Sequence, residues 1–511
     1  MTHILRERAL SHPTEVALTD GDTSFTWSEL GDICGQAVNA LASLGLDKTQ
    51  RIAIIARNSS LTTLVYLMAR YSGRQIVAAS FHLKPEEIRY ILSDANVSAV
   101  FCDESTRENV VAGAHAAGIT SIFSVDGADD DTDGVASFEK WVAGFSVTEP
   151  NLEIPASPNV LYTSGTTGFP KGVMNPQLLT CSIRKHVEDY REPSDAGPYL
   201  NVGPMYHAGP LSALRRLTGG RPLVVLKQFT PEGVLQTIDH YGITGTTMVP
   251  THFARLLDLP ASVREGYDLS RLNFLDHTGS SCPSVVKEEM IKWVGPILSD
   301  RYGGTETGTV CSISSAEWLA HRGSVGKCLA RFSAHVVNDD GIEVPVGTNG
   351  RLFFIDHSGM GVNYLNAPEK TAAAHLRPGV FTIGDLGYVD AEGYVFVTGR
   401  TADTIVSGGV NLYPAEIERV LLECNLVNDA AVIGVDDKVM GETVKAFVVL
   451  HSSREHANIG DVGAIELVRD YCREHLAGPK VPRIFEVINE LPRNPMGKID
   501  RKVLRASVTE K

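Results

Sequence analysis

Short apolar, β-branched runs alternate with segments of helical periodicity through the first quarter of the chain. Residues 15–19 and 24–27 predict a hairpin that turns at Asp20-Gly21-Asp22. Runs typical of strands buried on both faces follow at 51–56, 75–79 and 97–101. The segments with helical spacing are 27–44, 61–71 and 85–92. This alternation predicts a parallel sheet covered by helices.

Further along, the pattern changes twice. Alternation resumes with predicted strands at 222–226, 245–249 and 272–275, and beyond residue 345 the chain becomes strand-rich, at 350–355 and 393–397. After residue 400 the segments predict a separate α+β unit. Its helix begins at Pro414, with Ile417, Val420, Leu421 and Cys424 on one face. Its other elements are strands at 430–435, 444–450 and 484–488 and a helix at 462–476.

Composition and charge narrow the class of partner. The chain has 511 residues, enough for several folding units, and 46 basic against 61 acidic side chains give a net charge of −15. Such a surface repels nucleic acid, so no nucleic-acid partner is expected. The acidic run at 127–133 is interpreted as a solvated loop rather than a metal site.

The cysteine, histidine and hydropathy patterns indicate in which compartment the protein is located and whether it binds a metal. The eight cysteines form no CxxC pair, and the sixteen histidines include no HExxH, so we expect free thiols and no protein-bound transition metal. The N-terminus has no apolar core behind its charged run, and no apolar stretch reaches about 18 residues. We therefore expect a cytoplasmic protein without an integral membrane segment, while a peripheral membrane contact stays open.

One segment carries the strongest chemical signal. Residues 162–173 combine small hydroxyl residues, glycines and a lysine directly behind an apolar run. Glycines bring backbone N–H groups close to an anion, hydroxyls add donors, and a lysine adds a mobile positive charge. The alternative is a hydroxyl-rich surface turn. We interpret the segment as a polyphosphate cradle formed by Thr163, Ser164, Gly165, Thr166, Thr167, Gly168 and Lys171, although it lacks Walker A spacing.

Four later segments suit the same nucleotide. Residues 302–308 offer an aromatic ring, close-approach glycines and a carboxylate, and a carboxylate beside polyphosphate is how proteins hold Mg²⁺. Asp385 follows a predicted strand and can accept hydrogen bonds from ribose hydroxyls. Arg400 and Lys498 supply cations. Each alone could be a cap, a turn residue or a solvated charge, but their combination favours a nucleotide site.

In their order along the chain and in their residues, these segments resemble the motifs of the adenylate-forming (AMP-binding) superfamily of acyl- and aryl-CoA synthetases, peptide-synthetase adenylation domains and beetle luciferases. The resemblance covers nearly the whole chain, from residues 25–30 to Lys498. It implies an α/β fold: a large N-terminal domain of mixed α/β sheets plus a β-rich subdomain, then a small mobile α+β C-terminal domain. The implied boundaries are 1–399, a hinge at 400–403, and 404–511.

The resemblance also implies a role for each matching residue. Lys498 would bridge the acid and the α-phosphate of ATP, Thr305 would bind the α-phosphate, and Glu306 would hold Mg²⁺. The resemblance assigns nucleotide binding to the cradle residues above and to Tyr302, Gly303, Gly304, Asp385 and Arg400. It assigns Ser280 and His207 to the acid tunnel, and Gly408 and Gly409 to the pantetheine of coenzyme A.

Two positions depart from the family pattern. Ile383 stands where a threonine usually precedes the ribose aspartate, which removes one hydroxyl. Ala402 stands where the hinge usually carries Asp or Lys, and Asp403 follows it. Because a hinge only has to absorb a backbone rotation, alanine is compatible with domain movement.

The implied activity is an ATP-dependent carboxylic acid–CoA ligase that forms an acyl-AMP and then an acyl-CoA. The acid is expected to be a medium- or long-chain fatty acid or a bulky ring-bearing acid. For Arg215 and Arg216 on a predicted helix, a solvated face is favoured over pairing with a second substrate carboxylate. The alternatives are an acyl-AMP ligase that loads a carrier protein, a luciferase-like enzyme, and a catalytically silent nucleotide-binding homologue. The oligomeric state is left as monomer or homodimer.

Overall fold

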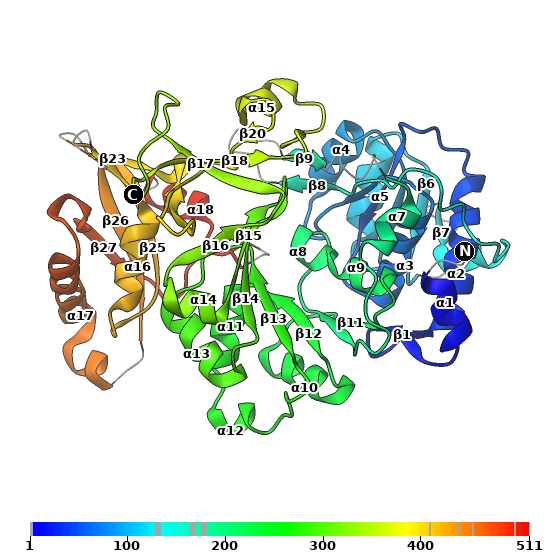
Figure 1. The fold of residues 1–511 in the computed structure, drawn as a ribbon, viewed down its shortest axis with the longest axis horizontal. Helices are drawn as coiled ribbons and strands as arrows, with labels where there is room; N and C mark the ends of the chain where they lie inside the picture. Colours follow the sequence, from blue (N-terminus) through cyan, green and yellow to red (C-terminus); the bar gives the residue numbers. More distant parts are fainter. Residues whose placement is uncertain are drawn as a thin grey trace.

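The computed structural model describes residues 4–127, 134–163, 170–174, 181–407, 410–437, 440–451, 454–494 and 497–509. Two large sheets and one small sheet form its framework, and the small sheet lies at one end of the molecule, orange to red in Figure 1. The predicted α/β class, with a large N-terminal and a small C-terminal domain, is confirmed. Of the predicted acidic loop at 127–133, residues 128–133 lie outside the described residues.

The first sheet contains the predicted βα repeats. Its strands run in the order β7-β6-β5-β3-β4-β8-β9, all parallel except β9. They are β3 (Arg51–Ile55), β4 (Ile76–Ala78), β5 (Val97–Cys102), β6 (Ser121–Ser124), β7 (Val135–Ser137), β8 (Val160–Thr163) and β9 (Lys171–Met174). The surrounding helices are α1 (Ile4–Ser11), α2 (Trp27–Ser43), α3 (Ser60–Tyr71), α4 (Pro85–Asp94), α5 (Arg107–Ala116) and α6 (Phe138–Ala143).

Local signals explain where these helices begin and end. Thr26 and Glu29 form a capping box at the start of α2, which satisfies N–H groups that the helix itself leaves unpaired. The helix ends before Gly45, which adopts a positive φ of 61°. Both ends match the predicted helix, and the predicted hairpin before it is present as β1 (Val16–Thr19) and β2 (Ser24–Thr26).

The second sheet is the longest, with 15 strands among the described residues. Its parallel part is β1, β11 (Leu223–Val225), β10 (Tyr199–Asn201), β12 (Gly245–Met248), β13 (Phe274–Thr278) and β14 (Leu298–Gly304). The helices that accompany it are α7 (Ile183–Glu188), α8 (Ala208–Leu211), α9 (Ala213–Thr218), α10 (Pro231–Tyr241), α11 (Pro250–Leu257), α12 (Ala261–Arg264) and α13 (Ser284–Val294). Strand β13 begins and ends later than the predicted 272–275.

The antiparallel half of this sheet is the predicted strand-rich region. It contains β15 (Gly308–Ser314), β16 (Ser324–Cys328), β17 (Phe332–Val337), β18 (Gly350–Asp356), β19 (His375–Arg377), β20 (Val380–Phe381), β21 (Asp385–Val389) and β22 (Val395–Arg400), with α14 (Ser315–Ala320) and α15 (Pro368–Ala373). Strands β14 and β22 therefore belong to one sheet, which brings two of the predicted nucleotide segments together.

The small domain is built on a five-stranded sheet. Its elements are η2 (Thr401–Asp403), β23 (Ile405–Ser407), β24 (Val410–Leu412), α16 (Pro414–Glu423), β25 (Val427–Asp437), β26 (Gly441–Leu450), α17 (Arg454–His475), η3 (Gly478–Lys480), β27 (Ile484–Val487) and α18 (Arg501–Thr509). As predicted, Pro414 opens α16, and its apolar face is buried in the domain core. Helix α17 is interrupted at Gly460, and its regular part begins where the periodicity placed it.

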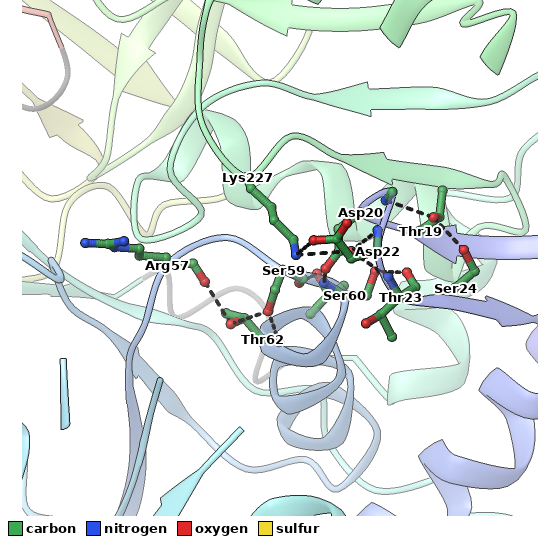
Figure 2. A network of polar contacts seen from close by, with 12 residues as sticks. Thr19, Asp20, Asp22, Thr23, Ser24, Arg57, Ser59, Ser60, Thr62 and Lys227 are labelled. Carbon is green, nitrogen blue, oxygen red and sulfur yellow. Dashed lines mark hydrogen bonds and ion pairs between the residues drawn. The ribbon is translucent and has the colours of Figure 1, made fainter. Parts of the chain in front are cut away.

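A buried carboxylate ties the first hairpin to both large sheets. Asp20 Oδ1 accepts the backbone N–H groups of Asp22 (3.0 Å) and Thr23 (2.9 Å), and its Oδ2 accepts that of Ser60 at the start of α3 (2.8 Å) (Figure 2). Lys227, which follows β11, approaches the same carboxylate at 3.6 Å. The side chain of Asp20 is only 2% exposed, so water cannot replace these contacts.

Replacing Asp20 by alanine is expected to destabilise the protein, because it leaves several backbone donors without an acceptor. The expected loss in free energy of unfolding is about 2–4 kcal/mol, measured by urea unfolding. Asp22→Ala is the matched control: the Asp22 side chain is 81% exposed and pairs with Lys227 at the surface, so its stability should stay close to wild type. Equal losses in the two variants would contradict this assignment.

Candidate active site

Asp385 on β21 is held between two donors from other strands of the same sheet, Tyr302 on β14 and Arg400 on β22. The Tyr302 hydroxyl donates to Asp385 Oδ2 at 2.6 Å, and Arg400 Nε donates to Asp385 Oδ1 at 2.9 Å. Strands β21 and β22 pair in a register that sets Asp385 opposite Arg400. The carboxylate is 5% exposed while the Arg400 side chain is 59% exposed, so the carboxylate is fixed and the guanidinium still faces solvent.

The electrostatics of this trio follow from burial and charge. Burial, followed by the Asp385 charge, raises the pKa of the Tyr302 hydroxyl well above its usual value. The Asp385 charge also raises the pKa of Arg400, which burial opposes. Tyr302 therefore stays a neutral donor and Arg400 stays a cation at any physiological pH. A rigid anion beside a fixed cation is suited to hydroxyl donors and phosphate oxygens of a nucleotide.

Glu306 lies in the turn between β14 and β15 and is oriented by a tyrosine that the sequence reading missed. The Tyr364 hydroxyl, from the segment after β18, donates to Glu306 Oε1 at 3.3 Å. Lys171 Nζ lies 5.3 Å from the centre of the Tyr364 ring. Tyr364 therefore connects the lysine of the predicted phosphate cradle to the predicted magnesium ligand. No local motif marks Tyr364, because its role depends on two distant segments meeting.

Glycines let the backbone of the β14–β15 turn come close to its neighbours. A Cβ on Gly303 would lie 1.9 Å from the carbonyl oxygen of Gly308, and a Cβ on Gly304 would lie 2.8 Å from Glu306 Oε2. The backbone contact excludes a side chain at Gly303, whereas a side chain at Gly304 would displace the Glu306 carboxylate. Thr305 sits between Gly304 and Glu306 in this turn. Ile383, the departure from the family pattern, packs near Gly304, 3.7 Å from where its Cβ would be.

Lys498 reaches this group from the small domain. Burial lowers its pKa, and so does the Arg400 charge, while the charges of Glu306 and Asp385 raise it. Lys498 thus lies within electrostatic reach of three predicted site residues that belong to the large domain. Burial and then the Lys498 charge lower the pKa of His207 to about 3. The structure therefore brings Lys498, His207, Glu306, Asp385 and Arg400 together.

His207 presents a neutral imidazole at the site. It precedes α8, and its Nε2 is buried without a hydrogen-bond partner among the described residues. Gly209 lies beside Thr278 at the end of β13: its Cβ would be 3.3 Å from Thr278 Cγ2. The predicted acid-binding segments therefore adjoin one another. Ser280, predicted at the same place, is exposed after Gly279, whose φ is 94°.

The structure describes the two edges of the predicted phosphate cradle. Thr163 and Lys171 face each other across β8 and β9. The remaining cradle residues and the predicted pantetheine loop lie outside the described residues; these are Ser164, Gly165, Thr166, Thr167, Gly168, Gly408 and Gly409. Among the described residues, no group of three or more side chains could hold a metal ion by itself.

Arg215 and Arg216 do not form the solvated helix face that the sequence favoured. Arg216 Nη1 donates to Glu192 Oε1 at 2.6 Å, and Arg215 lies 4.8 Å above the ring of Tyr190. Both side chains are half-buried on α9. The Arg216 charge is balanced by a carboxylate of the protein itself.

A cavity of about 400 Å³ lies beside the turn that carries Lys498. Both domains line it: Thr251 and Arg255 belong to α11, Lys227 follows β11, and Arg493 and Gly497 belong to the small domain. Three of these side chains are basic, but Lys227 pairs with Asp22 and Arg493 pairs with Asp429, so the protein's own carboxylates balance two of the three charges.

Four histidines make stability depend on pH: His186 and His277 are buried, and His207 and His252 are half-buried. Burial is the main cause that lowers the pKa of His186 and His207 to about 3 and of His252 and His277 to about 4. In the unfolded chain their pKa is about 6.5, so between these values the unfolded state binds more protons. Their contribution to stability is complete above about pH 6.5 and is lost as the pH falls.

Thermal unfolding at pH 7.5 and pH 5.0 checks this expectation. Each of the four histidines should lower the free energy of unfolding of the protein by about 2 kcal/mol at pH 5 relative to neutral pH, so the melting temperature should fall sharply. A His186→Gln variant removes one titrating group and should show a smaller fall. A melting temperature that is constant over this range would contradict the assignment of neutral, buried imidazoles.

The structure also bears on the state of the cysteines and on the hydropathy of the helices. All eight cysteines are free, as predicted, although Cys311 and Cys328 face each other on β15 and β16 with their Sγ atoms 3.6 Å apart. Within the described residues, no helix combines the length and the hydropathy needed to cross a membrane.

Comparison with known proteins agrees with this geometry. The model of the family described as AMP-binding enzyme matches residues 5–364, and that of the AMP-binding enzyme C-terminal domain matches residues 416–498. A 2-succinylbenzoate–CoA ligase of Bacillus mycoides (strain KBAB4) is 29% identical over 528 aligned positions, covering 100% of this chain and 99% of its own.

Two other relatives are similar over nearly their whole length. A 3-[(3aS,4S,7aS)-7a-methyl-1,5-dioxo-octahydro-1H-inden-4-yl]propanoyl:CoA ligase of Mycobacterium tuberculosis (strain ATCC 25618 / H37Rv) is 31% identical, covering 96% of each chain. The solved o-succinylbenzoate CoA synthetase of Bacillus subtilis, in complex with its acyl-adenylate intermediate, superposes with a TM-score of 0.79 at 26% identity, covering 100% of this chain and 98% of that one.

The chain belongs to the AMP-binding enzymes, the adenylate-forming superfamily that its motifs resemble. Within this superfamily it is an AMP-forming acid–thiol ligase of the acyl-CoA synthetase type.

Proposed function

We propose that this enzyme activates a ring-bearing carboxylic acid with ATP and transfers the acyl group to coenzyme A. The observation that carries the proposal is that the turn with Lys498 docks on Thr251 of the large domain, within reach of the charges of Glu306, Asp385 and Arg400. The ring-bearing character is supported by the relatives, since the acids named for them are 2-succinylbenzoate and a fused-ring propanoate. A fatty acid remains the second candidate.

In the first half-reaction, the acid carboxylate attacks the α-phosphorus of ATP, and pyrophosphate leaves. Lys498 is positioned to neutralise charge shared by the carboxylate and the α-phosphate, with Thr305 as a further donor. Asp385 would accept the ribose hydroxyls, Arg400 would pair with the nucleotide, and Tyr302 would stack against the base. His207, neutral at physiological pH, would border the acid without adding charge. No covalent enzyme intermediate is needed, so positioning and charge stabilisation account for the catalysis.

Glu306 is the residue that would hold Mg²⁺. Mg²⁺ usually binds proteins through one or two carboxylates and substrate phosphates while keeping several waters, so a single oriented carboxylate fits it. The Tyr364 hydroxyl fixes one carboxylate oxygen and leaves the other for the ion. When bound, the ion would offset the negative charge of the phosphates.

The second half-reaction requires the small domain to rotate about a hinge within 400–403. Arg400 is bound to Asp385 of the large domain, at 2.9 Å. Asp403 pairs with Arg501 and Arg505 of α18, at 3.8 and 3.3 Å, so it moves with the small domain. Thr401 is also held to the large domain, because its N–H donates to the Gly384 carbonyl at 2.9 Å, so the rotation would centre on Ala402. This rotation would withdraw Lys498 and bring the loop around Gly408 to the acyl-AMP.

Coenzyme A is the acceptor that the relatives favour, since the two reported above are named as CoA ligases. Its phosphate groups would meet Arg255, which lines the cavity beside the Lys498 turn. Once that turn has moved away, the thiol would approach the acyl-AMP from this side.

The test is an incubation of the full chain with ATP, Mg²⁺ and coenzyme A against a panel of acids. The panel contains 2-succinylbenzoate, fused-ring propanoates, benzoates, cinnamates, and short to long fatty acids. Pyrophosphate and acyl-CoA are measured together. Formation of both products only from ring-bearing acids supports the proposal, and both products only from fatty acids would reject its substrate class. Pyrophosphate without a thioester would point to a carrier-protein acceptor.

A further inference from the structure

We infer that Thr251 is a positioning residue for the adenylation step: its hydroxyl holds the turn that presents Lys498 in the active site. The inference rests on the proposed two-step function, because it assigns the contact to one of the two half-reactions.

The contact joins the two domains next to the catalytic lysine. Thr251 Oγ1 donates to the carbonyl oxygen of Gly497 at 3.1 Å, and Lys498 is the next residue. Thr251 lies in the first turn of α11, which is anchored by the buried side chains of Phe253 and Leu256. The large domain therefore offers a fixed donor to a backbone atom adjoining Lys498.

The turn that carries Lys498 is held by its own hydrogen bonds. The N–H of Gly497 donates to the carbonyl of Asn494 (2.8 Å), the N–H of Asn494 donates to the carbonyl of Lys498 (2.8 Å), and the N–H of Lys498 donates to Asn494 Oδ1 (3.1 Å). Arg493 Nη1 donates to the same Gly497 carbonyl at 2.6 Å. Arg493 Nη2 also donates to Asp429 Oδ2 on β25 at 2.5 Å, so the turn moves as one piece with the small domain.

Gly497 makes the close approach possible. Its φ is 72°, and a Cβ there would lie 2.7 Å from Thr251 Oγ1. The surfaces of Thr251 and Gly497 are thus fitted to each other without room for a side chain. If Thr251 only lined the acid pocket, nothing would require it to face the backbone of the other domain so closely.

The consequence is selective for one half-reaction. The Thr251–Gly497 bond exists while Lys498 is docked and must break when the small domain rotates. Its free energy therefore favours the adenylation arrangement and contributes nothing to the thioester-forming one. A role in binding the acid would instead change the KM for the acid, and a purely structural role would weaken both half-reactions.

The experiment compares Thr251→Val, which keeps the shape and removes the donor, with Thr251→Ser, which keeps the donor. ATP–pyrophosphate exchange reports adenylation, and thioester formation from supplied acyl-AMP reports the second step. For Thr251→Val, the kcat of exchange should fall about fivefold, as expected for one lost hydrogen bond, with the KM for the acid and the thioester step unchanged. Thr251→Ser should restore exchange.

A control and an independent readout complete the test. Thr237→Val removes a hydroxyl that donates within α10, to the Gly233 carbonyl, and should change neither half-reaction. Hydrogen exchange of the Gly497 and Lys498 amides should be faster in Thr251→Val than in wild type. Equal losses in both half-reactions, a raised KM for the acid alone, or unchanged amide exchange would overturn the inference. Wild-type protein without any exchange activity would reject the proposed function, while amide exchange still decides whether Thr251 holds the turn.

Discussion

Replacement of Lys498 by alanine is expected to lower the rate of adenylation by about 10²–10³-fold, the usual effect of removing one preorganised charge-stabilising donor. Lys498 is the cation that the small domain adds to a site otherwise built on the large domain. Its lowered pKa arises mainly from burial, which also strengthens its interaction with a developing negative charge.

The same variant should form the thioester from supplied acyl-AMP at close to the wild-type rate. In the proposed cycle Lys498 has left the site by that stage, so its replacement should not change the rate of thioester formation. Lys498→Arg is the matched variant: it keeps the charge but changes its geometry, so partial activity in the first step is expected. Pyrophosphate exchange and acyl-CoA formation are measured separately. Equal loss in both steps would show that Lys498 has been given the wrong role.

Replacement of Asp385 by alanine is expected to raise the KM for ATP by about 10²-fold, equivalent to losing two hydrogen bonds to a charged acceptor. The variant removes the proposed ribose acceptor and also leaves Arg400 without its partner. An unpaired guanidinium next to the nucleotide would then be free to change orientation. The KM for the acid should change much less, because Asp385 is not part of the acid-binding segments.

Two matched variants separate the charge of Asp385 from its surroundings. Asp385→Asn keeps the shape and one acceptor oxygen, so an intermediate KM for ATP is expected. Tyr302→Phe keeps the carboxylate and removes only the hydroxyl that donates to it at 2.6 Å, so its effect on KM should be the smallest of the three. Isothermal titration with a non-hydrolysable ATP analogue checks the order. An effect of Tyr302→Phe as large as that of Asp385→Ala would place the nucleotide elsewhere.

Much of the fold follows from local sequence alone. The strands at 51–56, 75–79 and 97–101 were predictable because each is a short apolar run bounded by turn residues. Helix boundaries were predictable where capping residues or prolines mark them, as at Thr26 and Pro414. These signals depend only on neighbouring residues, so they can be recognised without knowledge of the rest of the chain.

The predictions that failed or shifted depend on distant neighbours. Strand β13 runs to Thr278 because it pairs with β12 and β14 along its whole length, which the apolar run at 272–275 does not indicate. Arg216 looked like a surface charge until α9 packed against Glu192, which precedes β10. A charge pattern on a helix shows which residues could be exposed, but only packing decides which are.

The sequence by itself determined which kinds of side chain the site contains. The hydroxyl and glycine run before Lys171, the acid Glu306, the acid Asp385 and the base Lys498 are each identified by residue type and motif. Tertiary structure alone decided how they meet: Tyr364 orients Glu306, Arg400 and Tyr302 fix Asp385, and Thr251 holds the backbone next to Lys498. Thr251 and Gly497 are separated by 246 positions, and the physical reason for the division is that such contacts depend on sheet register and domain docking, which local periodicity does not encode.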